Sequence, residues 1–285
     1  VLGGAGTDVL FGGDGVDRIY SDGDGGVYLG GNGDDYMYSS LGLGLEIMDG
    51  EMGFDSIDLT GYSGNYEFNM STGLTNFTGE KFANFEFVKM GKGNDTVTGN
   101  NADNWIYGGD GNDKINGGDG NDTLYGEEGF DTISGGNGND FISPGSAGGI
   151  YKGDAGDDVI FSSLVSPENM DGGTGIDTVH FYGETDYSYN MATGLTSFEG
   201  ESFINFENAE MGWGDDTVYG SALNNVIKGD SGDDILFGKD GNDTLYGDTG
   251  SDIIVGGAGK DLLYGHEVGS LFGFEPTKFK FLATS

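Results

Sequence analysis

The sequence lacks cysteine altogether, has three prolines, and has 11 lysine and arginine residues against 49 acidic ones, for a formal charge of −38. Without cysteine there is no disulfide framework, so stability outside a cell would have to come from another source, such as metal. The strong negative charge argues against nucleic acid and anionic lipid surfaces as partners. No apolar run is as long as a membrane span requires, which argues against membrane insertion, and there is no N-terminal signal peptide. Because Val1 leads straight into a repeat, we expect the chain to begin inside a longer protein or to be a processed product.

Glycine, in contrast, is abundant, with 60 of 285 residues. Residues 108–143 form four units of nine residues in unbroken register: GGDGNDKIN, GGDGNDTLY, GEEGFDTIS and GGNGNDFIS. Each unit has glycine at positions one and four, aspartate at six, and isoleucine or leucine at eight. The glycines predict a turn over the first six positions, followed by a three-residue strand whose eighth-position side chain faces a core. One unit buries one aliphatic residue, so only a stack of many units, a repeat solenoid, is stable.

Stacking brings the sixth-position aspartates of successive turns close together, and something cationic must separate them. Lysine and arginine are too few for this role. A hard dication suits carboxylates together with the carbonyls of glycine-rich turns, and Ca²⁺ takes six to eight oxygen ligands. We therefore predict that calcium binding and folding are coupled, since bound ions would remove much of the charge that holds the metal-free chain open.

The pattern GGxGxDxUx, where U is a large aliphatic residue, resembles the RTX (haemolysin-type) calcium-binding repeat. The resemblance implies an all-β fold: a right-handed parallel β-roll or β-helix solenoid, an elongated rod with two nonapeptides per coil and calcium between turns one coil apart. This spacing of two nonapeptides implies eight metal sites made of paired aspartates, so about eight or more Ca²⁺ ions. The pairs are Asp17 with Asp35, Asp95 with Asp113, Asp113 with Asp131, Asp122 with Asp140, Asp140 with Asp158, Asp216 with Asp234, Asp234 with Asp252, and Asp243 with Asp261.

Some units depart from the pattern at position six. Asparagine stands there at Asn104 and Asn225, which supply one charge fewer than aspartate, so we expect weaker sites. Glycine stands there at Gly26 and Gly149, which predicts gaps or low occupancy.

Two further aspartates, Asp55 and Asp177, have no aspartate two nonapeptides away on either side. We interpret their units as ordinary turns rather than metal sites.

A longer repeat lies above the nonapeptides. Residues 1–125 form one super-repeat, which includes irregular aromatic coils at 59–89; residues 126–246 form a second; and a third begins at 247–264. Within the irregular stretch, Tyr66 to Met70 predicts a strand, and Ser71 to Gly73 a turn. Residues 265–285 are a C-terminal cap or a secretion tail, and these two roles are compatible.

Catalysis has little support. His180 and His266 lie outside the repeats, and His180 falls where the other copy has Asp58. There is no nucleophile elbow, phosphate loop, zinc spacing or EF-hand loop, so we predict no catalytic residue and no enzyme activity. Aromatic residues recur at position nine and predict a ladder along the sheet, or else a face that stacks on sugars or another protein. They are Phe11, Tyr20, Tyr38, Tyr107, Tyr125, Phe161, Tyr219, Phe237, Tyr246 and Tyr264.

The first functional hypothesis is a secreted structural protein, a segment of a surface layer, extracellular matrix, filament or adhesin. It would fold on binding Ca²⁺ outside the cell or at its surface after Gram-negative-type (type I) secretion, and self-association into a fibre or lattice would fit this role. The alternative is the non-catalytic C-terminal module of a secreted protease, lipase or polysaccharide epimerase. The sequence leaves both open.

Overall fold

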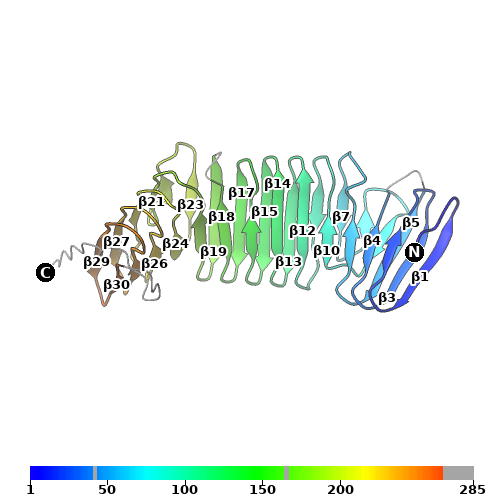
Figure 1. The fold of residues 1–285 in the computed structure, drawn as a ribbon, viewed down its shortest axis with the longest axis horizontal. Helices are drawn as coiled ribbons and strands as arrows, with labels where there is room; N and C mark the ends of the chain where they lie inside the picture. Colours follow the sequence, from blue (N-terminus) through cyan, green and yellow to red (C-terminus); the bar gives the residue numbers. More distant parts are fainter. Residues whose placement is uncertain (41–43, 164–166, 266–285) are drawn as a thin grey trace. The chain divides into compact units, whose positions relative to one another are not determined.

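The computed structural model describes residues 1–40, 44–163 and 167–265. Over these residues the chain is all-β and contains no helix; it is a parallel β-solenoid, as predicted (Figure 1). It divides into two compact units, Val1–Ala147 and Gly148–Ser285, each of which is described separately. Of the predicted tail 265–285, all residues but Gly265 lie outside the described residues, as does His266. The boundaries of the super-repeats stay predictions.

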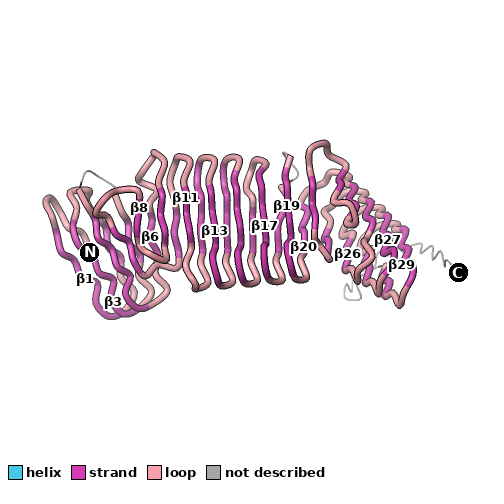
Figure 2. Tube along the Cα trace, turned by 180° about the vertical axis from the view of Figure 1, so that it is seen from behind, coloured by secondary structure: helices cyan, strands magenta, loops and turns pink. Residues whose placement is uncertain are grey.

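The strands of the first unit alternate between two sheets, except that β7, β8 and β9 follow one another in the same sheet. One has the order β1-β3-β5-β9-β8-β7-β11-β13-β15, and the other β2-β4-β6-β10-β12-β14-β16. Their bounds are β1 (Asp8–Asp14), β2 (Arg18–Tyr20), β3 (Gly26–Asn32), β4 (Tyr36–Tyr38), β5 (Glu46–Met52), β6 (Ser56–Asp58), β7 (Glu67–Asn69), β8 (Leu74–Thr75), β9 (Lys81–Ala83), β10 (Phe87–Lys89), β11 (Thr96–Thr98), β12 (Trp105–Asp110), β13 (Lys114–Asp119), β14 (Thr123–Glu128), β15 (Asp131–Asn137) and β16 (Phe141–Ser143). Turns join the strands at both edges of each coil (Figure 2).

The register confirms two nonapeptides per coil. Trp105 pairs with Thr123, and Lys114 pairs with Thr132, so each residue lies opposite the one two nonapeptides further on. This spacing places the eighth-position residues in columns inside the solenoid, where Leu124 and Ile133 are fully buried. The core is therefore the stack of single aliphatic residues that the repeat predicts.

In most regular turns, glycine at position four is required by the close approach of the preceding turn. Gly111 has φ of 143°, and a Cβ on it would overlap the carbonyl oxygen of Gly93 from the preceding coil. Position two also has positive φ but tolerates a side chain, as Glu127 shows with φ of 69°. At Gly111 the two turns thus stack at backbone distance, which only glycine permits, whereas Ala102 and Leu223 stand at position four in two other units.

Residues 59–90 form a wider coil, as the aromatic content predicts. The predicted strand at Tyr66 to Met70 is present as β7, and β7 pairs antiparallel with β8 after a turn. The rings of Phe68 and Phe82 pack edge to face at 5.9 Å, and both are buried. We call residues 59–90 the first wide coil.

The second unit contains β17 (Gly149–Ala155), β18 (Val159–Ser162), β19 (Glu168–Thr174), β20 (Thr178–Phe181), β21 (Ser188–Asn190), β22 (Leu195–Thr196), β23 (Ser202–Ile204), β24 (Asn208–Glu210), β25 (Thr217–Tyr219), β26 (Val226–Lys228), β27 (Ile235–Asp240), β28 (Thr244–Tyr246), β29 (Ile253–Ala258) and β30 (Leu262–Tyr264). Its sheets have the orders β17-β19-β23, β18-β20-β24-β26-β28-β30 and β22-β21-β25-β27-β29. Residues 182–211 form the second wide coil, where β21 again pairs antiparallel with β22.

Eight of the ten ninth-position aromatics stack in pairs, as the predicted ladder requires. Tyr20 stacks on Tyr38, and Tyr107 on Tyr125, with ring centroids 4.5 Å apart in both pairs. In the second unit the corresponding pairs are Tyr219 with Phe237 at 5.0 Å and Tyr246 with Tyr264 at 4.8 Å. The rings pack on one another along the outside of the sheet.

Candidate calcium sites

The predicted aspartates lie where each turn runs into its strand, and most of them are buried. Asp17 and Asp261 are half-buried, and the rest are nearly or fully buried. The buried ones are Asp35, Asp95, Asp113, Asp122, Asp131, Asp140, Asp158, Asp216, Asp234, Asp243 and Asp252. Burial of so many carboxyl groups is costly unless each finds a compensating partner.

In most of these residues one carboxylate oxygen has such a partner. The backbone N–H of Asp95 donates to Asp113 Oδ1 at 2.7 Å, and that of Asp113 donates to Asp131 Oδ1 at 2.8 Å. The same contact joins seven of the eight predicted pairs at 2.7 to 3.1 Å. The eighth, Asp140 with Asp158, takes one residue from each unit and stays a prediction.

The other carboxylate oxygen, Oδ2, lacks a hydrogen-bond partner in many of these aspartates. It is buried without a hydrogen-bond partner in several of the predicted residues: Asp35, Asp113, Asp122, Asp131, Asp216, Asp234 and Asp243. A Cβ placed on Gly108 would lie 2.5 Å from Asp113 Oδ2 and 2.9 Å from the Gly126 carbonyl oxygen. The unpartnered carboxylate oxygen and a carbonyl oxygen of the next turn therefore border the same small space.

The electrostatics make an ionised, uncompensated carboxylate unfavourable here. Burial, and after it the charges of Asp131 and Asp95, raise the pKa of Asp113 to about 7, while the hydrogen bond from Asp95 acts in the opposite direction. Burial likewise raises the pKa of Asp234 to about 7. A cation beside Oδ2 would remove this cost.

The residues fit calcium. The available donors are carboxylate and carbonyl oxygens, which are the ligands that Ca²⁺ prefers. Within residues 1–40, 44–163 and 167–265, no three acidic, histidine or cysteine side chains gather to hold a metal by themselves. The turn carbonyls would therefore have to complete the ligand shell, as the glycine-rich turns predict.

The nonapeptides match the RTX calcium-binding nonapeptide repeat over residues 1–27, 91–124, 116–149, 212–245 and 237–267. The chain belongs to the RTX calcium-binding repeat proteins. Both wide coils fall outside the matched segments. The RTX repeats imply that the protein binds calcium.

Other comparisons add less. A comparison with curated protein sequences found no match. Among solved structures, the chain is similar to the X-ray crystal structure of a hyperactive, Ca²⁺-dependent, β-helical antifreeze protein from an Antarctic bacterium, with 20% identity over 87% of this chain and 84% of that one. The TM-score of that match is 0.33. Among the described residues, no helix is long and apolar enough to cross a membrane.

The units that lack aspartate at position six place different groups where the carboxylate would lie. At Asn104 the backbone N–H still reaches Asp122 Oδ1 at 2.7 Å, but the Asn104 side chain accepts a hydrogen bond from the Asn100 N–H in its own turn. At Gly26 the ring of Tyr28, an eighth-position residue, takes the place of the missing carboxylate, since a Cβ on Gly26 would lie 2.8 Å from Tyr28 Oη. The predicted gap at Gly26 is thus filled by a phenol.

The interpretation of Asp55 and Asp177 as ordinary turns rather than metal sites stays a prediction, but both aspartates do have an aspartate partner in the preceding coil. The Asp35 N–H donates to Asp55 Oδ1, and the Asp158 N–H donates to Asp177 Oδ1, both at 2.8 Å. These pairs are 20 and 19 residues apart because the coils that contain them are longer than two nonapeptides. The fixed spacing missed them, although their turns have the same glycine pattern.

A second ladder at position five was also missed. The N–H groups of Asn112 and Phe130 donate to Asn94 Oδ1 at 3.0 Å and to Asn112 Oδ1 at 2.8 Å, one coil back. The recurring Asn-Asp pair in the repeats was the available signal, because asparagine and aspartate side chains accept backbone hydrogen bonds in turns. Position five therefore ties successive turns together without metal.

His180 pairs with Glu210 at 2.7 Å, and Lys228 contacts the same carboxylate. Burial lowers the pKa of His180, against the effect of Glu210.

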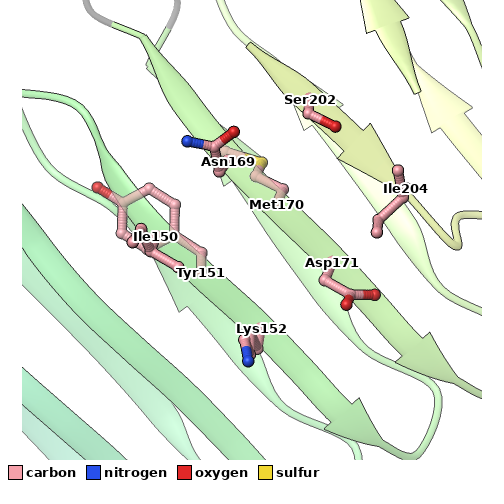
Figure 3. Close-up of a pocket in the computed structure, with 8 residues that line it drawn as sticks. All are labelled: Ile150, Tyr151, Lys152, Asn169, Met170, Asp171, Ser202 and Ile204. Atoms are coloured by element: carbon pink, nitrogen blue, oxygen red, sulfur yellow. The ribbon is translucent and has the colours of Figure 1, made fainter. Parts of the chain in front are cut away.

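A hollow of about 210 Å³ lies on the second unit, across β17, β19 and β23 (Figure 3). It contains none of the predicted site residues. Its lining residues are Ile150, Tyr151, Lys152, Asn169, Met170, Asp171, Ser202 and Ile204.

Proposed function

We propose that this chain is a structural segment of a secreted protein that folds when it binds calcium outside the cell. The observation that carries the proposal is the recurrence of buried Oδ2 atoms without hydrogen-bond partners in both units. Each leaves a carboxylate half-satisfied, and a Ca²⁺ ion at each would supply the missing interaction. The aspartates of the eight predicted pairs, with Asp55 and Asp177, are the proposed ligands.

Calcium-dependent folding suits export. A chain with a formal charge of −38 repels itself when metal-free, and binding to the folded state alone shifts the equilibrium by mass action. Low cytoplasmic calcium would leave the chain unfolded for type I secretion from a Gram-negative-type cell, and higher calcium outside would fold it. The proposed location is therefore extracellular or at the cell surface.

The structural role is supported by the duplication of the wide coil. Tyr66 contacts Glu80 in the first copy, and Tyr187 makes the same contact with Glu201 in the second. Whole units repeated in this way extend a scaffold, whereas a catalytic site gains nothing from repetition of its support. Self-association into a fibre or lattice is part of this proposal.

Circular dichroism tests the coupling of calcium to folding. We expect the β-signal of the purified chain to be lost in excess chelator and to return when millimolar calcium is added. A β-signal unchanged in chelator would contradict the proposal.

Electron microscopy in millimolar calcium tests the structural role. We expect ordered fibres or lattices. Strictly monomeric particles would contradict self-association and would favour the alternative, an accessory module of a secreted enzyme.

A further inference from the structure

Near its end, each wide coil has a short segment that leads into the next strand of the solenoid and lacks the RTX turn. In the first unit this segment is Asn84, Phe85 and Glu86, and in the second it is Asn205, Phe206 and Glu207. Strand pairing places Phe87 opposite Ser56, so Glu86 occupies the level of Asp55 in the next coil. A glutamate thus stands where the regular coils have their sixth-position aspartate.

The contacts of Asp55 toward this segment match those in the regular coils. The Asp55 N–H donates to Glu86 Oε2 at 2.9 Å, as the Asp113 N–H donates to Asp131 Oδ1 at 2.8 Å. Asp55 is 1% exposed, and its Oδ2 has no hydrogen-bond partner. The longer glutamate side chain replaces the aspartate of a complete turn.

A carbonyl oxygen borders the same space. A Cβ on Gly50 would lie 2.6 Å from Asp55 Oδ2 and would overlap the Asn84 carbonyl oxygen. Asn84 has φ of 56°, and its side-chain amide donates to Asp49 Oδ1 at 2.6 Å. This hydrogen bond holds the left-handed residue in place and thereby fixes its carbonyl group.

The second unit repeats the arrangement. The Asp177 N–H donates to Glu207 Oε2 at 3.0 Å, and Asp177 is fully buried with an unpartnered Oδ2. A Cβ on Gly172 would lie 2.9 Å from Asp177 Oδ2 and would overlap the Asn205 carbonyl oxygen. Asn205 has φ of 58°, and its amide donates to Asp171 Oδ1 at 2.7 Å.

Not every buried carboxylate of the wide coils has this character. The hydroxyls of Tyr66 and Thr75 both donate to Oε2 of Glu80, so that oxygen already has hydrogen-bond partners within the protein. Asp55 and Asp177 differ because no donor reaches their Oδ2 atoms.

We propose that each wide coil binds one additional divalent cation, with calcium as the expected ion, between Asp55, Glu86 and the Asn84 carbonyl in the first unit and between Asp177, Glu207 and the Asn205 carbonyl in the second. Two carboxylates and a carbonyl are hard oxygen donors of suitable charge. The ions fasten the ends of the wide coils to the regular coils. This inference rests on the proposed calcium-dependent folding and extends it to segments without the repeat.

The test uses the whole chain with Glu86→Gln and Glu207→Gln combined. Glutamine keeps an oxygen that accepts the backbone hydrogen bond but removes the charge. Bound calcium per chain is counted by equilibrium dialysis at saturation. The matched control combines Glu67→Gln and Glu199→Gln, two exposed glutamates of the same wide coils.

We expect the Glu86 and Glu207 variant to bind two fewer ions than the control, with an unchanged β-signal in saturating calcium. An equal ion count and equal affinity would overturn the inference. If the wild-type chain bound no calcium, the proposed function itself would fail, so the two failures are distinguishable.

Should the variant not fold, crystals of the wild-type chain grown with terbium decide the matter. Anomalous density beside Asp55 Oδ2 and the Asn84 carbonyl would support the site. Terbium in the regular turns alone would overturn it.

Discussion

Asp113 of the regular coils and Glu80 of the first wide coil represent opposite ways to compensate a buried carboxyl group. In the regular coils Asp113 satisfies one oxygen with a backbone N–H and leaves Oδ2 unpartnered. In the first wide coil Glu80 accepts hydrogen bonds from Tyr66 and Thr75, and aromatic residues fill the surrounding core. The comparison teaches that the proposed need for metal is local: it belongs to buried carboxylate oxygens that no donor reaches, such as Oδ2 of Asp113 and Asp55, and not to those that hydroxyl groups satisfy.

The largest expected effect is a change of folding stability with pH. It tests whether the buried aspartates whose Oδ2 has no hydrogen-bond partner determine the stability of the metal-free regular coils. Burial raises the pKa of Asp113 from 3.8 to about 7, so the folded metal-free coil holds a proton that the unfolded chain has released. The stability of the metal-free chain should therefore be highest below about pH 4 and fall as the pH rises to about 7. In calcium the trend should reverse, because the ion requires ionised carboxylates.

Circular dichroism of metal-free and calcium-loaded protein across this pH range measures the trend, with thermal unfolding at each pH where a β-signal is present. A metal-free chain that became more stable between about pH 4 and 7 would break the comparison.

The next effect is that of Asp113→Asn, which removes charge from two proposed sites in the regular coils. We expect a loss of about 2–4 kcal/mol in the free energy of unfolding in calcium, because each of the two proposed sites loses one buried charged ligand. The control Asp119→Asn changes an exposed third-position aspartate and should cost less than about 0.5 kcal/mol. Urea unfolding at several calcium concentrations measures both, and equal losses would contradict the site.

A smaller effect is expected in the wide coil. Tyr66→Phe removes a hydroxyl donor from the buried carboxylate of Glu80 and should cost about 1–3 kcal/mol. Because no ion is involved, we expect this cost to stay the same at every calcium concentration, unlike that of Asp113→Asn. Tyr187→Phe should behave in the same way in the second unit. A cost that grew with calcium would erase the distinction between the two kinds of coil.

The smallest effect is expected in the aromatic ladder, which involves no buried carboxylate. Tyr246→Ala removes one ring of the stacked pair with Tyr264 and should cost about 0.5–1 kcal/mol. Thr244→Ala, on the same strand, serves as the control and should cost less. A urea midpoint shifted equally by both would show that the stacked ring adds nothing.

Much of the regular site could be predicted from the sequence because its information is local. Nine positions specify the turn, the core residue and the acid, and the RTX resemblance supplies the spacing of two nonapeptides that brings Asp113 next to Asp131. The same spacing failed at Asp55, whose partner Asp35 is 20 residues away. It also gave no indication that Tyr28 would occupy the place of the carboxylate missing at Gly26.

The sequence by itself determined the solenoid, the column of aliphatic residues and the acid at most regular turns, since a complete unit contains all the residues that specify them within nine positions. Only the tertiary structure decided which residues meet across the wide coils. There the register is set by backbone pairing between strands such as β6 and β10, whose sequence separation depends on the excursion between them. That pairing places Glu86 beside Asp55 after 31 residues, a distance that no periodic pattern specifies.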